Sequence, residues 1–202
     1  MSRLVETIKI LNGRIYNLTY HQIRFDKTRK ALFDDTTTIS LREKIIQQGI
    51  PGKGLYKCRV EYGKNMLKTE FLPYQFPEIS SLALVHDNEI AYEYKWVDRS
   101  ALDRLFSRKG EASEIIIIKE GKVTDGFYYN LVFEKQGKLF TSDTPLLQGT
   151  QRASLIQKGK IIEITITEKD LFEFEKIHLI NAMTLPGKLV VDIKKGKLLK
   201  GC

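Results

Sequence analysis

The sequence predicts a two-part α+β fold, and three observations support this prediction. Segments with strand-like alternation and segments with helical spacing follow one another without a regular strand–helix–strand repeat. Around Pro73, Pro77 and the Ser80-Ser81 pair the composition changes from strand to irregular linker. The length of 202 residues suits either one domain or two small ones. We therefore expect a small N-terminal α+β domain over residues 1–77 and a larger C-terminal α+β domain over residues 78–202.

The N-terminal part is predicted to begin with a hairpin. Asn12-Gly13 lies between two alternating segments, which is typical of a type I′ turn. Further along, Ser40 has the character of a helix N-cap, and Glu43 follows three residues later, as in a capping box. The elements predicted after the hairpin are a helix over residues 20–35, a helix over 40–49, and strands over 54–63 and 66–74.

The C-terminal part is predicted to alternate between strands and short helices. Its most apolar block, Ile115 to Ile118, indicates a buried strand and is too short to span a membrane. The predicted elements are a strand over 81–85, a helix over 98–108, a hairpin over 122–133, a strand over 138–141, a helix over 152–158, a strand over 161–165, a short helix over 168–173, a strand over 176–181 and a closing hairpin around Gly196.

Composition narrows the function classes. The net charge of +8 raises the possibility of nucleic-acid binding, but the basic residues are scattered and no reading motif accompanies them, so we favour a solvated surface. Two cysteines provide neither a disulfide framework nor metal-ligand spacing. The first ten residues lack the apolar stretch of a secretory signal. We expect a cytoplasmic protein that binds neither a membrane nor a metal.

Lys95 lies between Tyr94 and Trp96, just before a predicted helix. A partly desolvated lysine has a lowered pKa, and its neutral amine can form a Schiff base with a carbonyl compound. Alternatively, its stem packs on the aromatic rings while its ammonium group reaches water. This stretch alone leaves both interpretations open and favours the second.

Four other segments carry polar groups at predicted strand or helix ends. Asp125 and Asn130 interrupt the two strands of the 122–133 hairpin. Gly149 precedes a predicted helix whose first amides would suit a phosphate, and Asn181 begins a polar turn after a buried strand. Arg24 could add a fork-shaped phosphate partner. Each segment also has an ordinary interpretation, as a capped helix, a loop or a surface arginine.

Taken in chain order, these segments resemble the class IV, or fold-type IV, pyridoxal-phosphate enzymes, which include branched-chain and D-amino-acid aminotransferases and 4-amino-4-deoxychorismate lyase. The resemblance extends over nearly the whole chain and implies the same two-domain fold. The segments that carry it are YHQIRF with Arg24, KWVDR with Lys95, EGKVTDGFYYNLVF with Asp125, TPLLQGTQR with Gly149, and INAM with Asn181.

The resemblance implies pyridoxal 5′-phosphate as cofactor and a role for each segment. Lys95 would hold the cofactor through its amine and then move a proton on the substrate. Asp125 would pair with the pyridine nitrogen and keep it protonated. Asn130 is expected to hold the acid-bearing turn, with a cofactor contact as the lesser alternative. The expected phosphate-binding residues are Arg24, Thr150, Gln151, Asn181, Ala182 and Met183.

The sequence departs from the family pattern in three places. Asp125 stands where a glutamate is usual, and Thr150-Gln151 differs from the residues that commonly follow the glycine. The chain begins near the family's F-E-T segment, here Val5-Glu6-Thr7, which implies a shortened N-terminal domain. The family also implies a homodimer, in which a partner subunit could complete the substrate-side wall.

The last cofactor segment suggests which reaction is run. Asn181-Ala182-Met183 resembles the lyases more than the serine-glycine-threonine turn of the aminotransferases, and so does the spacing of Lys95 and Arg99. We therefore predict a lyase that converts 4-amino-4-deoxychorismate into pyruvate and 4-aminobenzoate, a folate precursor. Two alternatives remain open: an aminotransferase for branched-chain or D-amino acids, and a degenerate family member without catalytic activity.

Overall fold

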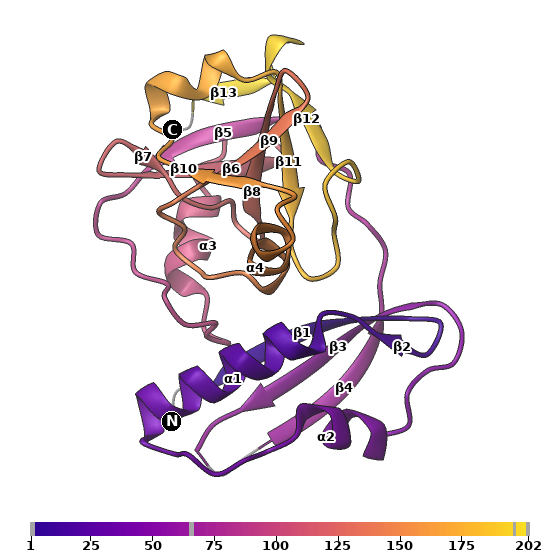
Figure 1. Ribbon diagram of the computed structural model, residues 1–202. Helices are drawn as coiled ribbons and strands as arrows, with labels where there is room; N and C mark the ends of the chain where they lie inside the picture. The colour runs from indigo at the N-terminus through magenta and orange to yellow at the C-terminus, as the bar shows by residue number, and fades with distance from the viewer. Residues whose placement is uncertain (1–2, 65–66, 196, 201–202) are drawn as a thin grey trace. The chain divides into compact units, whose positions relative to one another are not determined.

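A computed structural model describes residues 3–64, 67–195 and 197–200 of the chain (Figure 1). It divides into two compact units. Unit 1 comprises Met1–Phe76 and Tyr94–Asp98, and unit 2 comprises Pro77–Glu93 and Arg99–Cys202. Both units mix helices and strands, which confirms the predicted α+β class. Among the described residues, no helix combines the length and the apolar character needed to cross a membrane.

Unit 1 is an antiparallel sheet with two helices on one face (Figure 1). The strand order is β2-β1-β3-β4, and the helices pack against buried side chains of the sheet to form one core cluster. Its elements are β1 (Leu4–Leu11), β2 (Arg14–Ile15), α1 (Leu18–Phe33), α2 (Leu41–Gln47), β3 (Leu55–Tyr62) and β4 (Leu67–Pro73).

Local sequence signals explain the turns and helix starts of unit 1. Asn12 and Gly13 both have positive φ, 48° and 76°, as a type I′ hairpin requires, so the first predicted hairpin is confirmed. Ser40 accepts a hydrogen bond from the Glu43 amide and begins α2 as predicted. Helix α1 begins at Leu18, two residues before the predicted start.

Unit 2 contains two sheets. One has the strand order β10-β9-β8-β11-β12 and the other has the order β13-β5-β6-β7. Among the described residues, side chains from both sheets form one shared core cluster. Its elements are β5 (Leu82–His86), α3 (Ser100–Phe106), β6 (Glu114–Lys119), β7 (Lys122–Val123), β8 (Asn130–Lys135), β9 (Lys138–Ser142), α4 (Thr150–Gln157), β10 (Ile162–Ile164), the 3₁₀ helix η1 (Glu168–Glu173), β11 (Lys176–Ile180), β12 (Val190–Asp192), the 3₁₀ helix η2 (Ile193–Lys195) and β13 (Leu198–Lys200).

The predicted hairpin at the C-terminal end is wrong. Strand β12 pairs antiparallel with β11, whereas β13 pairs parallel with β5 in the other sheet. The pairing of β13 with β5 gives hydrogen-bond partners to backbone groups at the edge of β5. It also places Leu198 of β13 against the core. Gly196, on which the prediction was centred, lies outside the described residues.

Candidate active site

The acid-bearing turn of unit 2 is closed by side-chain hydrogen bonds. Asp125 forms an isolated β-bridge with Asn130, the first residue of β8. The Asn130 amide donates to Asp125 Oδ1 at 2.7 Å and to the Leu147 carbonyl at 3.0 Å. Asp125 Oδ2 accepts from the Leu147 amide at 2.9 Å. Asn130 therefore holds the carboxylate in a fixed position.

Burial gives Asp125 an unusual ionisation. Its side chain is largely hidden from solvent, and this burial raises its pKa to about 6, against the opposing effects of the Leu147 amide, Asn130 and Arg152. A carboxylate in this environment gains more from a cationic or N–H partner than an exposed one, because solvent screens the interaction less. A protonated ring nitrogen is such a partner.

The start of helix α4 packs directly against Asn130. Gly149 is the N-cap residue in extended conformation and has no side chain to accept from the first amides of the helix. A Cβ atom at this position would lie 1.8 Å from Asn130 Oδ1, so only glycine fits. Thr150 and Gln151 are buried in the first turn, at the positive end of the helix dipole. An anion is stabilised at such an end.

The polar turn after β11 lies near the same residues. Strands β8 and β11 pair antiparallel with Asn130 opposite Ile180, so Asn181 follows immediately beyond this pair. Asn181 Oδ1 accepts from the Met183 amide at 2.9 Å, and its Nδ2 donates to the Tyr128 carbonyl at 3.3 Å. Unit 2 thus gathers three of the predicted segments, around Asp125, Gly149 and Asn181 with Ala182 and Met183, at one end of β8 and β11.

Arg24 in unit 1 is bound by a buried carboxylate. Its Nε donates to Glu6 Oε1 at 2.8 Å and its Nη2 donates to Glu6 Oε2 at 2.6 Å. His21 Nδ1 lies 2.6 Å from the same Oε2. Glu6 and His21 are fully buried, whereas Arg24 keeps 15% of its side chain exposed. The guanidinium group is therefore fixed along one edge and still reaches the surface of the unit.

The groups of this cluster shift the pKa values of Glu6 and His21. Burial alone would raise the pKa of Glu6, but Arg24 and His21 outweigh it and lower that pKa to about 2. Burial lowers the pKa of His21, and the charges of Arg24 and Lys95 act in the same direction, against the hydrogen bond to Glu6. At neutral pH the cluster consequently holds an ionised Glu6 and a neutral His21.

Lys95 is attached to strand β1 through its backbone. The Val5 amide donates to the Lys95 carbonyl at 2.9 Å, and the Val97 amide donates to the Arg3 carbonyl at 2.8 Å. Tyr94 and Trp96 on either side pack against the core of unit 1. The Trp96 amide also donates to the Tyr94 carbonyl at 3.0 Å, so Lys95 lies at the centre of a tight backbone turn. The segment Tyr94–Asp98 therefore belongs to unit 1, whereas the sequence had placed the lysine in the C-terminal domain.

Glu114 and Arg99 fix the turn that follows Asp125 through bonds to its backbone. Glu114 Oε1 accepts from the amides of Ile115 and Phe127 at 2.8 and 2.9 Å, and burial raises its pKa to about 7. Arg99 donates to the Phe127 carbonyl and lies over the rings of Phe127 and Tyr128, 4.6 and 4.2 Å from their centroids. Both polar groups of the Phe127 backbone are therefore held.

Sequence reasoning missed Glu6, His21 and Glu114 as contributors to these arrangements. The signal for Glu6 was present, because it follows the same two-residue period as the buried Leu4 and Ile8 and must share their face. Glu114 directly precedes the four isoleucines of β6, which was a comparable signal. A lone acid in phase with core residues requires a partner.

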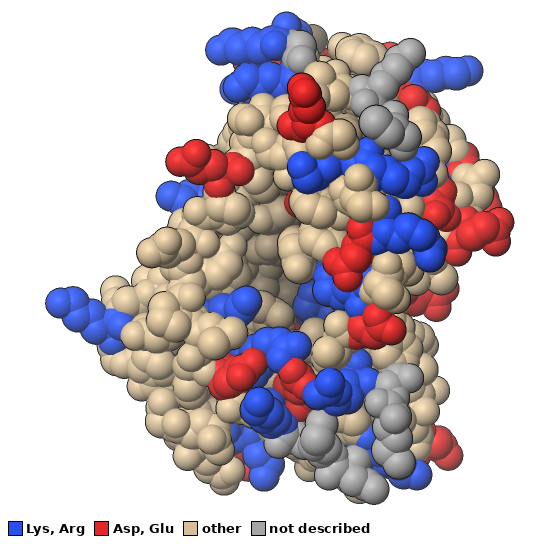
Figure 2. Space-filling view, turned by 180° about the vertical axis from the view of Figure 1, so that it is seen from behind, with Lys and Arg blue, Asp and Glu red and all other residues tan. Residues whose placement is uncertain are grey.

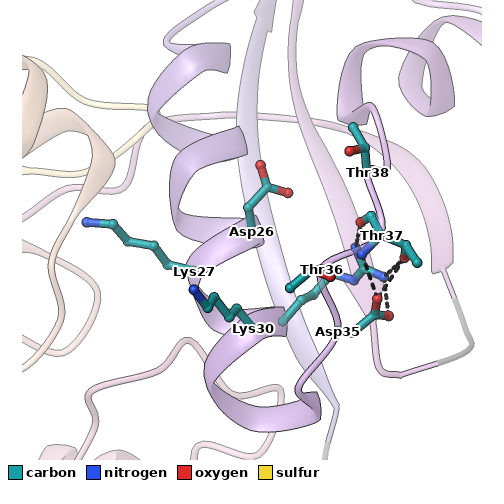
Figure 3. A pocket seen from close by; sticks show the side chains of 8 residues that line it. Asp26, Lys27, Lys30, Asp35, Thr36, Thr37 and Thr38 are labelled. Atoms are coloured by element: carbon teal, nitrogen blue, oxygen red, sulfur yellow. Dashed lines mark hydrogen bonds and ion pairs between the residues drawn. The ribbon is translucent and has the colours of Figure 1, made fainter.

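A cavity of about 310 Å³ lies elsewhere in unit 1, between the C-terminal half of α1 and the following loop (Figure 3). Arg29 closes it by donating to the Thr37 carbonyl at 2.7 Å and pairing with Asp35, while Lys27 points away from the loop. None of the residues predicted to bind the cofactor lines this cavity. The lining residues are Asp26, Lys27, Arg29, Lys30, Asp35, Thr36, Thr37 and Thr38.

The surface charge is mixed rather than concentrated. Figure 2 shows acidic side chains interspersed with basic ones over the face in view. Nucleic-acid binders usually gather their basic residues in a patch or stripe.

Within the described ranges, no group of three histidine, cysteine, aspartate or glutamate residues is placed to hold a metal ion.

Residues 3–190 match the model of the amino-transferase class IV family, and the chain belongs to this family. Its members are enzymes that depend on pyridoxal phosphate. This match confirms the family resemblance and the fold type predicted from the sequence.

Three relatives illustrate the similarity. A protein of Haemophilus influenzae whose function is uncharacterised is 38% identical over 185 residues, which are 91% of this chain and 98% of that protein. A solved structure from Haemophilus somnus 129PT, described provisionally as a 4-amino-4-deoxychorismate lyase, is 36% identical with a TM-score of 0.86 and covers 91% of this chain and 97% of its own. A hypothetical aminotransferase from Mycobacterium tuberculosis in its PLP-bound form is 17% identical with a TM-score of 0.71, covering 93% of this chain and 80% of its own, and shares the fold.

The residues of each unit suit parts of this cofactor. Unit 2 offers a buried carboxylate for a pyridinium nitrogen and a helix start for an anion. Unit 1 offers a fixed arginine for a phosphate and a lysine for an aldehyde. The donor set is therefore chemically consistent with pyridoxal phosphate.

Proposed function

We propose that this chain is a pyridoxal-phosphate-dependent lyase that forms 4-aminobenzoate and pyruvate from 4-amino-4-deoxychorismate. The observation that carries the proposal is the gathering of Asp125, the start of α4 and the Asn181 turn at one end of β8 and β11. The similarity to the Haemophilus somnus structure favours the lyase over other reactions of the family.

Each predicted residue has one task in this proposal. The phosphate is bound by Arg24, by the amides and side chains of Thr150 and Gln151, and by the turn of Asn181, Ala182 and Met183. Asp125 pairs with the pyridine nitrogen, and Asn130 keeps Asp125 in place. When bound, the cofactor withdraws electrons from the substrate carbon that carries the amine.

Lys95 performs the proton transfers. Its amine removes the proton from the carbon that carries the substrate amine, and the electron pair left behind expels the enolpyruvyl oxygen as the C–O bond breaks. The ring becomes aromatic, and Lys95 returns a proton to the departing enolate to give pyruvate. No external oxidant or reductant is required.

The decisive experiment supplies 4-amino-4-deoxychorismate to the purified protein with pyridoxal phosphate and measures 4-aminobenzoate and pyruvate. A parallel assay measures amino transfer to 2-oxoglutarate from branched-chain and D-amino acids. Aromatic product supports the lyase. Amino transfer alone would establish the aminotransferase instead. Cofactor binding without turnover on any of these substrates would establish a degenerate family member.

Lys95→Ala should abolish the visible absorbance of the bound cofactor and its fixation by borohydride. Lys9→Ala is the matched control, because Lys9 belongs to the same unit and burial lowers its pKa. A protein that takes up no cofactor would refute the proposal. We further propose a cytoplasmic homodimer, for which sedimentation of the cofactor-loaded protein tests the oligomeric state.

A further inference from the structure

Glu6 occupies an unexpected position for a charged residue. It lies on β1 in phase with Leu4, Ile8 and Ile10, which are all fully buried, and it is fully buried itself. An isolated charge there would be strongly unfavourable, so its partners must compensate for the lost solvation. The proposed function assigns no task to this carboxylate.

Both partners of Glu6, His21 and Arg24, come from α1. Their hydrogen bonds to Glu6 define the position of the Arg24 side chain. Glu6 receives two hydrogen bonds from Arg24 at 2.8 and 2.6 Å, which form a two-point pair that fixes the plane of the guanidinium group. His21 lies 2.6 Å from Glu6 Oε2 and limits the remaining freedom of the carboxylate. The direction of Arg24 is consequently set by Glu6 and not by solvent.

The same strand also fixes the lysine segment. Val5, the residue before Glu6, donates its amide to the Lys95 carbonyl, and Leu4 forms a bridge with Trp96. Residues 4–6 of β1 therefore attach to Lys95 through the backbone and to Arg24 through the Glu6 side chain. A shift of either group relative to the other would have to break one of these attachments.

We infer that Glu6, supported by His21, is a positioning residue that fixes Arg24 relative to Lys95 for recognition of the cofactor phosphate. The inference rests on the proposed function, because it assigns the phosphate to Arg24. It predicts that Glu6 affects the phosphate end of the ligand and leaves the aldehyde and ring contacts unchanged.

Comparison of pyridoxal phosphate with pyridoxal, which lacks the phosphate, tests this inference. Apoprotein of the wild type and of Glu6→Gln is titrated with each ligand by absorbance, and circular dichroism checks the fold. Glu6→Gln should lower affinity for pyridoxal phosphate by about ten- to a hundredfold, as expected for the loss of a charged hydrogen-bonded pair, and leave pyridoxal affinity unchanged.

The matched control is Glu61→Gln. Glu61 is also a poorly exposed glutamate paired with arginines, Arg3 and Arg59, and it lies opposite Val5 in the register, so its side chain is on the other face of the sheet. This variant should change neither affinity. If Glu6→Gln does not fold, Glu6→Asp keeps the charge but shortens the reach, and it should lower pyridoxal-phosphate affinity selectively by a smaller factor.

The remaining outcomes contradict the inference in distinct ways. Equal losses for both ligands would mean that Glu6 only supports the fold. Unchanged or tighter binding of pyridoxal phosphate would mean that removing a negative charge matters more than orientation. A wild-type protein that binds neither ligand would refute the proposed function itself, which separates that failure from a failure of Glu6.

Discussion

Gly149→Ala offers a direct test of how the acid-bearing turn and the start of α4 depend on each other. Gly149 has φ −70° and ψ 138°, a conformation that alanine adopts readily, so the substitution introduces no backbone strain. The new methyl group would instead lie 1.8 Å from Asn130 Oδ1 and 3.0 Å from its Cγ. Because no side chain tolerates such a contact, Asn130 must move.

The size of the effect follows from what Asn130 would lose. Its amide donates to the Asp125 carboxylate at 2.7 Å and to the Leu147 carbonyl at 3.0 Å. A bond to a charged group contributes about 1.5–3 kcal/mol and a neutral one about 0.5–1.5 kcal/mol. Alanine restricts the unfolded chain and returns about 0.4–1 kcal/mol. We expect a net loss of about 1–4 kcal/mol in the free energy of unfolding.

Urea unfolding followed by circular dichroism measures this loss, and a double-mutant cycle identifies its cause. In an Asn130→Ala background the clash is absent, so Gly149→Ala should there cost little or nothing. Gly52→Ala is the control, since no atom lies within 4 Å of its added methyl group. Additive losses from Gly149→Ala and Asn130→Ala would refute the proposed steric link.

Three further predictions concern the charged residues. Glu114 keeps its proton up to about pH 7 when folded but loses it near pH 4.5 when unfolded, so its ionisation destabilises the fold as pH rises. Measured by urea unfolding, the free energy of unfolding of Glu114→Gln should therefore rise relative to wild type by about 2–3 kcal/mol between pH 5 and pH 8. A difference that stays constant with pH would contradict this. Asp125→Asn should keep the bound-cofactor absorbance but lower turnover by orders of magnitude, whereas Asp125→Glu should be tolerated; near-normal turnover of Asp125→Asn would show that the acid is misassigned. Arg24→Ala should weaken cofactor binding by about ten- to a hundredfold, and excess cofactor should restore activity; if it does not while the fold is intact, Arg24 acts on the substrate.

The features predicted best from the sequence depend on neighbouring residues. Asn12-Gly13 forms its turn through its own positive φ values, and Ser40 caps α2 through an amide three residues away. The position of Gly149 before a helix was equally local. The order of the cofactor segments along the chain identified the family, although the roles of the individual residues toward the cofactor stay predictions.

The features that the sequence did not predict depend on distant partners. Strands β5 and β6 pair in parallel across α3, and β9 and β10 pair in parallel across α4, so each pair forms a strand–helix–strand unit within a largely antiparallel arrangement. An extended segment alone does not specify which edge it joins. For the same reason the attachment of Lys95 to β1 could not be inferred from the aromatic residues beside it.

The location of Tyr94–Asp98 in unit 1 has a consequence for how such genes can be recombined. A chimera of two family members joined at residue 77 would appear to exchange whole units. It would in fact take β1 with Glu6 and α1 with Arg24 from one parent, and the Lys95 segment from the other. Strand β1 of one parent would then have to pair through its backbone with the Lys95 segment of the other parent, although these two segments did not evolve together. A crossover after residue 98 avoids this mismatch but divides unit 2 instead.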